Sequence, residues 1–177
     1  MCQESNLFLK NHEAGGLFCN LFDDDVSKDE IVIFNADMLP SSRFGLGLLD
    51  TAEQMTVVGE ELFVCETYND RLQVFSLAGE HRRSMTGAWK GPCALCFVKD
   101  RLYLLEQRAD NYMDEGELAS QRIIVLSLQG ETLEVYTHPV EGQYFSGLCY
   151  FDGKLLALLV KREKLHWEFA DIVSFKP

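Results

Sequence analysis

A segment of ten residues occurs twice in this 177-residue chain, and this internal repeat limits the possible folds more than any other feature. RLQVFSLAGE, which begins at Arg71, returns as RIIVLSLQGE from Arg122, with six of ten positions identical. Looser copies begin at Glu30 (EIVIFNADM) and at Asp171 (DIVSFKP). Self-similarity of this kind is typical of chains built from one supersecondary unit repeated several times.

A second element repeats alongside the first. ALCFVKDRLYLLEQ from Ala94 resembles GLCYFDGKLLALLV from Gly147, and QMTVVGEELFVCET from Gln54 keeps the same outline. The weakest copy is LFLKNHEAGGLFCNLF from Leu7. Aligning one leucine of each copy gives spacings of 45, 40 and 53 residues, the last lengthened by an insertion, for Leu17, Leu62, Leu102 and Leu155. A period of 40–45 residues with three or four short strands is typical of β-propeller blades.

Turn residues support this interpretation. Asp152-Gly153 suits a two-residue hairpin that needs positive φ, and Gly79 and Gly130 are placed to turn the chain into a more polar outer strand. No long helical periodicity is present. We therefore predict a single all-β domain over 1–177, a β-propeller-like array of about four blades at 7–45, 54–87, 92–138 and 145–177. The fourth repeat has no outer strand, which predicts an incomplete ring able to self-associate through open blade edges.

One repeat carries a family pattern. Residues 62–87, LFVCETYNDRLQVFSLAGEHRRSMTG, resemble an NHL repeat, and the positions that match are Glu66, Thr67, Asn69, Arg71, Leu72, Gln73, Val74, Phe75 and Gly79. Glu66 stands where the family more often has Asp. The resemblance implies a rigid β scaffold that presents loops to another macromolecule, most often a protein and sometimes RNA. On physical grounds, Asn69 is predicted to favour the tight turn after the second strand. The aliphatic part of Arg71 is predicted to cover the apolar edge of the blade while its guanidinium stays hydrated.

Charge and composition narrow the partners. The net charge of −12 opposes binding to phosphate backbones, so nucleic acid is not expected. No apolar run is long enough to span a membrane, and the N-terminus does not resemble a secretory signal, which predicts a cytoplasmic protein. The six cysteines lie mostly in apolar runs and are predicted to be reduced core residues.

Carboxylates supply the one candidate metal site. Glu66 and Glu106 occupy the same position in consecutive repeats, at the end of the second strand, while Asp23 and Asp25 lie in the corresponding connection of the first repeat. Several oxygen ligands of this kind suit Ca²⁺. The alternative function is therefore a Ca²⁺-dependent propeller hydrolase or lyase. No titratable residue stands out as a nucleophile with a credible base. The leading interpretation is therefore a non-enzymatic protein, for which no cofactor is expected.

The leading hypothesis is a non-enzymatic scaffold that binds a protein partner. The connections between the second and third strands, 22–30, 107–121 and 161–170, are the longest and emerge on one face of a propeller, called here the B–C face. Long loops on a rigid scaffold are where binding residues concentrate. The contact residues predicted on this face are Arg108, Tyr112, Lys161 and Trp167.

Overall fold

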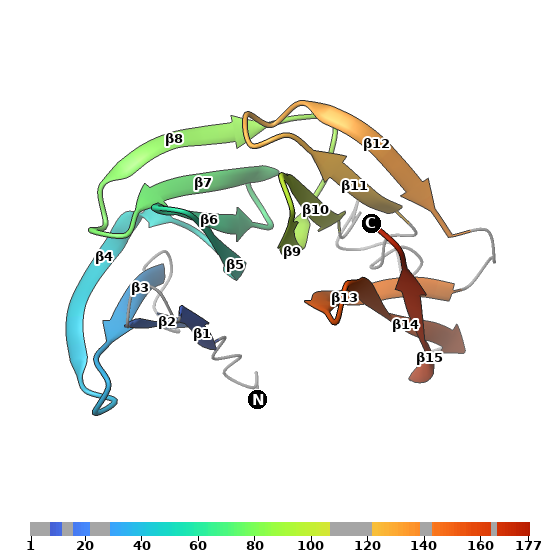
Figure 1. The fold of residues 1–177 in the computed structure, drawn as a ribbon, viewed down its shortest axis with the longest axis horizontal. Helices are drawn as coiled ribbons and strands as arrows, with labels where there is room; N and C mark the ends of the chain where they lie inside the picture. The colour runs from blue at the N-terminus through green and yellow to red at the C-terminus, as the bar shows by residue number, and fades with distance from the viewer. Residues whose placement is uncertain (1–7, 12–15, 22–28, 107–121, 139–142, 164–165) are drawn as a thin grey trace. The chain divides into compact units, whose positions relative to one another are not determined.

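Short antiparallel strands follow one another along the chain in the computed structural model, which describes residues 8–11, 16–21, 29–106, 122–138, 143–163 and 166–177. Within these ranges the strands form four sheets, each a meander in which neighbours in sequence are neighbours in the sheet (Figure 1). The described residues contain no helix. The prediction of an all-β chain of short antiparallel sheets is confirmed.

We call the four sheets blades 1 to 4 in chain order. Blade 1 contains β1 (Phe8–Asn11), β2 (Gly16–Leu21), β3 (Asp29–Phe34) and β4 (Pro40–Leu49). Blade 2 contains β5 (Ala52–Val58), β6 (Glu61–Glu66), β7 (Arg71–Ser76) and β8 (His81–Thr86). Blade 3 contains β9 (Pro92–Val98), β10 (Arg101–Glu106), β11 (Arg122–Leu126) and β12 (Thr132–Thr137). Blade 4 contains β13 (Gln143–Phe151), β14 (Lys154–Glu163) and β15 (His166–Phe175).

Turn chemistry sets the register of the hairpins. Asp152 and Gly153 have φ values of 49° and 75° and connect Phe151 to its partner Lys154, which makes the predicted two-residue turn. Gly79 and Gly130 also adopt positive φ, at 88° and 94°, where the third strand turns into the outer strand. The turn residues that the sequence predicted therefore adopt the positive φ that these turns need.

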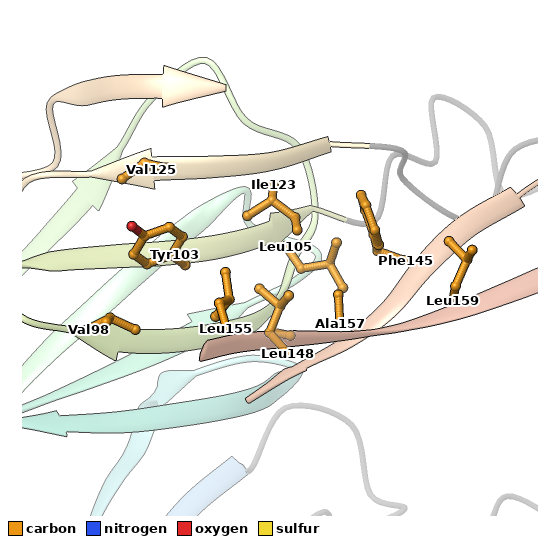
Figure 2. Packing of buried hydrophobic residues seen from close by; sticks show 11 residues of the cluster. Val98, Tyr103, Leu105, Ile123, Val125, Phe145, Leu148, Leu155, Ala157 and Leu159 are labelled. Carbon is orange, nitrogen blue, oxygen red and sulfur yellow. The ribbon is translucent and has the colours of Figure 1, made fainter. Parts of the chain in front are cut away.

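The chain divides into two compact parts, residues 1–85 and 86–177. In the first part, blade 1 packs against blade 2 through a core of aliphatic and aromatic side chains. In the second part, blade 3 packs against blade 4 in the same manner, and Figure 2 shows this cluster. Its members include Tyr103, Leu105, Ile123 and Val125 from blade 3 and Leu148, Leu155, Ala157 and Leu159 from blade 4.

Both blade contacts use the same positions of the repeat. The earlier blade contributes the face that carries Ile31 in blade 1 and Ile123 in blade 3, which we call face 2. The later blade contributes the opposite face, face 1. Its equivalent residues are Met55, Leu62, Val64 and Phe75 in blade 2 and Leu148, Leu155, Ala157 and Phe175 in blade 4. Within each of the two parts, face 2 of the earlier blade is therefore covered by face 1 of the later blade.

The prediction of a loop at 161–170 is wrong. β14 continues to Glu163 and β15 begins at His166, with Lys161 paired to Glu168 and Arg162 to Trp167. We call the paired residues 160–163 and 166–169 the ribbon. In the first repeat, Asp29 and Glu30 belong to β3 instead of a loop. The remaining predicted connections, 22–28 and 107–121, lie outside the described residues.

Candidate functional site

Glu66 ends β6 with a buried carboxylate that is fully engaged by its own part of the chain. Its Oε1 accepts hydrogen bonds from the backbone N–H of Asp50 at 2.9 Å, the Asn69 amide at 3.2 Å and Arg71 Nη2 at 3.2 Å. Its Oε2 pairs with Arg71 Nε. The side chain is 0% exposed. The carboxylate therefore joins the chain before β5, the end of β6 and the start of β7.

Glu106 repeats this arrangement at the end of β10. Its Oε2 accepts the backbone N–H of Lys90 at 3.2 Å and Arg122 Nη2 at 3.4 Å, and Arg122 Nε lies 2.8 Å from Oε1. The accepted N–H precedes the glutamate by 16 residues in both blades. The arginine stands five residues after Glu66 but 16 after Glu106, because the insertion 107–121 separates Glu106 from Arg122. We call the buried glutamate, together with its arginine and the backbone N–H that it accepts, the brace. The brace spans a tight turn in blade 2 and a long connection in blade 3.

Blades 1 and 4 lack this brace, and the register shows what replaces it. The pair equivalent to Glu66 and Arg71 is Leu21 and Glu30 in blade 1, and Leu159 and Asp171 in blade 4. In blade 4, Leu159 is buried in the core shared with blade 3. A bulge follows Leu159, and the hairpin then continues as the ribbon. Blade 1 has the same change of residues, and its second strand ends at Leu21, so the missing ion pair permits the ribbon but does not by itself produce it.

Each predicted metal ligand that the structure describes already has protein partners. Glu66 and Glu106 are each occupied by an arginine and a backbone N–H. Asp23 and Asp25 lie outside the described residues. Among the residues that the structure describes, no group of three or more His, Cys, Asp or Glu side chains could hold a metal ion.

Two roles in the NHL-like repeat differ from the prediction. Asp70, and not Asn69, takes the positive φ of the turn, at 52°, while the Asn69 amide donates to Glu66. Arg71 is an ion-pair partner of Glu66 instead of a hydrated cover for apolar surface. Both differences have one cause, since the buried carboxylate needs donors and these are the nearest side chains.

Sequence reasoning missed a polar network behind Arg71. Gln73 is buried, and its Oε1 accepts hydrogen bonds from Ser84 Oγ at 2.6 Å and lies 2.9 Å from His81 Nε2. Its Nε2 donates to the carbonyl of Leu48 at 3.4 Å. The position equivalent to Gln73 in blade 3 holds Ile124, which pairs with Val135. Because an aliphatic residue can take the place of Gln73 in blade 3, we interpret Gln73 as a structural residue. His81 contributes to the same hydrogen-bond network.

Asp29 is a buried acid at the start of β3 that the sequence did not single out. Its Oδ2 accepts the backbone N–H of Ala52 at 2.6 Å. Burial raises the pKa of Asp29 above its ordinary value of 3.8, opposed by the Ala52 hydrogen bond and reinforced by the charges of Asp50 and Glu66. The folded state therefore favours the neutral acid, and ionisation at pH 7 opposes folding.

We expect Asp29→Asn to melt at the same or a higher temperature than wild type at pH 7, because the amide can still accept the Ala52 N–H without burying a charge. The folded form binds the proton more tightly, so wild-type stability falls as pH rises from 3.8 through the raised pKa of Asp29. The advantage of the variant should therefore shrink in acid. Thermal melts from pH 3 to pH 7 test this, and an advantage that grows in acid contradicts it.

The predicted binding residues fall in two classes. Lys161 lies in β14 with an exposed side chain, and Trp167 lies in β15, paired with Arg162. Both belong to the ribbon. Arg108 and Tyr112 lie outside the described residues. Leu159 in place of a glutamate does not by itself identify the ribbon, because blade 1 also lacks the glutamate and its second strand ends at Leu21.

Four cysteines whose side chains the structure describes are free but not uniformly buried. Cys65 is buried, Cys93 and Cys96 are half-buried, and Cys149 is exposed, so the prediction of core cysteines is wrong for Cys149. Burial, with a contribution from Cys149, raises the pKa of Cys96 to about 11. Cys93 and Cys96 lie in β9, which confirms that this pair belongs to a strand.

Comparison with known proteins identifies the fold and no family. No protein-family model matches the chain, and no curated protein matches it. The structure is similar to the Neurospora crassa Pan2 WD40 domain, with TM-score 0.63 and 9% identity, over 98% of this chain and 50% of that one. It is similar to the designed protein Ika4, with TM-score 0.60 and 10% identity, over 99% of this chain and 93% of that one. BBS1N, solved in complex with ARL6DN, gives TM-score 0.60 and 12% identity, over 87% of this chain and 47% of that one.

These similarities show a β-propeller-type fold, since WD40 repeats build propellers from four-stranded blades. The chain spans about half the length of the Pan2 and BBS1N chains that it matches. No helix in the described part of the chain has both the length and the apolar character needed to cross a membrane.

Proposed function

We propose that this chain is a non-enzymatic β-propeller scaffold of the NHL-like kind, which binds a protein partner through the B–C face. The observation that carries this proposal is the ribbon. Blades 2 and 3 end their second strand at a braced glutamate, whereas blade 4 continues for four further residue pairs from Val160–Phe169 to Glu163–His166. A paired strand holds its residues in place, so a partner meets a surface that is already ordered.

The ribbon presents charged groups of both signs to a partner. Lys161 and Arg162 are cations on it, and Lys161 is paired in register with Glu168, in a chain whose net charge is −12. Charged groups held in a fixed pattern favour a partner of complementary charge pattern and set its orientation. Trp167 belongs to a residue type enriched at interaction hot spots. BBS1N supports the choice of a protein partner, because that structure was solved in complex with ARL6DN.

The Ca²⁺-dependent alternative is not proposed. It depended on free carboxylates at Glu66 and Glu106, and both are occupied by arginine and backbone N–H groups. Withdrawing either carboxylate to bind a cation would leave an arginine and a backbone donor without their acceptor.

We expect the double variant Lys161→Glu and Trp167→Ala to lose the proteins that the immobilised wild-type chain captures from cell extract. The reason is that it reverses one charge and removes the aromatic ring on the ribbon. Quantitative mass spectrometry of the captured proteins measures the loss. Arg82→Glu is the matched control, because Arg82 is exposed on β8 and its contact with Glu80, at 3.6 Å, lies on the surface.

The proposal is supported if the control keeps the captured proteins and the ribbon variant loses them at an unchanged melting temperature. Equal capture by all three proteins contradicts it. A large fall in the melting temperature of the ribbon variant would instead show that Trp167 stabilises the fold, and Lys161→Glu alone then becomes the test.

A further inference from the structure

The register of the ribbon divides its residues between two faces of different chemistry. Directly opposed residues of an antiparallel pair lie on one face, and successive pairs alternate between the two faces. One face, which we call the Trp face, carries the pairs Val160–Phe169 and Arg162–Trp167. The opposite face, which we call the charged face, carries the pairs Lys161–Glu168 and Glu163–His166. Lys161 and Trp167, the two predicted contact residues on the ribbon, therefore lie on opposite faces.

The charged face balances its charges within the ribbon. Lys161 is directly opposite Glu168, and opposite charges at such positions stabilise the strand pair itself. The second acid of this face, Glu163, is opposite His166. With His166 neutral, one lysine and two acids leave this face without a net positive charge, in a chain whose net charge is −12. An acidic segment is therefore not attracted to the charged face.

The Trp face combines one cation with three apolar residues. Its charged residue is Arg162, and none of the acids of the ribbon belongs to this face. The guanidinium of arginine is planar, pairs with a carboxylate through two hydrogen bonds and stacks on aromatic rings. Trp and Arg are also residue types enriched at interaction hot spots. The chemistry of this face therefore fits an apolar segment that carries a carboxylate.

We propose that the partner binds the Trp face of the ribbon, through a segment in which apolar side chains flank a carboxylate. The carboxylate pairs with Arg162, and the apolar side chains pack against Trp167 and Phe169. This inference rests on the proposed function and deepens it, because it names the face of the ribbon and the chemistry of the segment. The net charge of −12 opposes contact of the carboxylate with most of the chain, so Arg162 sets where the segment binds.

Two matched variants test which face binds. Arg162→Glu and Lys161→Glu each reverse one cation, at neighbouring positions of β14 on opposite faces of the ribbon. The probe is a fluorescein-labelled peptide in which leucines flank one glutamate, and fluorescence anisotropy measures its Kd for the full chain. We expect Arg162→Glu to raise this Kd by about tenfold or more relative to Lys161→Glu, because the glutamate then meets a like charge. The control Arg82→Glu is expected to bind like wild type.

Two further peptides separate the carboxylate from the apolar contact. Replacing the glutamate by glutamine, or the leucines by serine, should weaken binding to wild type, and the glutamine peptide should no longer distinguish the two variants. If circular dichroism shows that Arg162→Glu does not fold, Arg162→Gln replaces it and is expected to weaken binding of the glutamate peptide. Equal binding of the glutamate and glutamine peptides overturns the proposal, as does a larger effect of Lys161→Glu or the absence of binding by every peptide.

Capture from cell extract separates this inference from the proposed function. Loss of the captured proteins in Lys161→Glu but not in Arg162→Glu would overturn the choice of the Trp face and keep the ribbon as the binding site. Unchanged capture by both single variants and by the double variant Lys161→Glu and Trp167→Ala would contradict the proposed function itself.

Discussion

Replacing Glu66 with alanine is expected to lower the free energy of unfolding by about 3–5 kcal/mol, as is usual when one partner of a buried ion pair is removed. The substitution deprives the Asp50 N–H, the Asn69 amide and the Arg71 guanidinium of their shared acceptor. It also leaves a cavity at a fully buried position. Arg71 is 33% exposed and can turn partly to water, which favours the lower end of that range. Urea denaturation followed by circular dichroism measures the change.

A double-mutant cycle separates the ion pair from the rest of the effect. Glu66→Leu and Arg71→Leu should each destabilise the protein, and together they should cost less than the sum by about 1–3 kcal/mol. Blade 4 already has leucine at the position of Glu66, where Leu159 is buried, so an apolar side chain fits this place in the repeat. A loss below about 1 kcal/mol for Glu66→Ala would show that the brace contributes little.

The sequence predicts the blades because their signals are local. The Asp152-Gly153 turn and the alternation of apolar residues act within a hairpin, and the repeat places each hairpin in one frame. The repeat also predicts that Glu66 and Glu106 are equivalent. Their partners could not be predicted, because the accepted N–H groups lie 16 residues earlier in the chain, across a whole hairpin.

At the ribbon, the sequence predicted a loop where the structure has paired strands. A run of charged residues, KREK from Lys161, reads as a loop because it contains no apolar alternation. The pairing of Lys161 with Glu168 comes instead from continuation of the Leu155–Leu159 hairpin. Cooperative extension of an existing ladder outweighs local composition here.

Removing the Trp89 side chain is expected to destabilise the protein strongly. Trp89 is the largest fully buried side chain among the described residues, at 1% exposure. Trp89→Ala is expected to cost about 3–5 kcal/mol through the cavity that it leaves. Its Nε1 is buried without a hydrogen-bond partner among the described residues, so the indole contributes by packing alone. Trp89→Phe keeps an aromatic ring and removes that polar atom, and it should cost clearly less than Trp89→Ala.

Gly87 tests the same packing from the other side. A Cβ added at Gly87 would lie 2.0 Å from Cζ3 and 2.3 Å from Cε3 of Trp89, so Gly87→Ala forces the ring to move and should cost about 1–3 kcal/mol or more. Trp89→Leu removes the atoms that clash, and adding Gly87→Ala to it should cost little. Gly147→Ala is the matched control, because the added Cβ would meet only Leu158 Cβ at 4.0 Å. Urea denaturation of the four variants decides: a Gly87→Ala penalty equal in both backgrounds would show that the clash with Trp89 is not its cause.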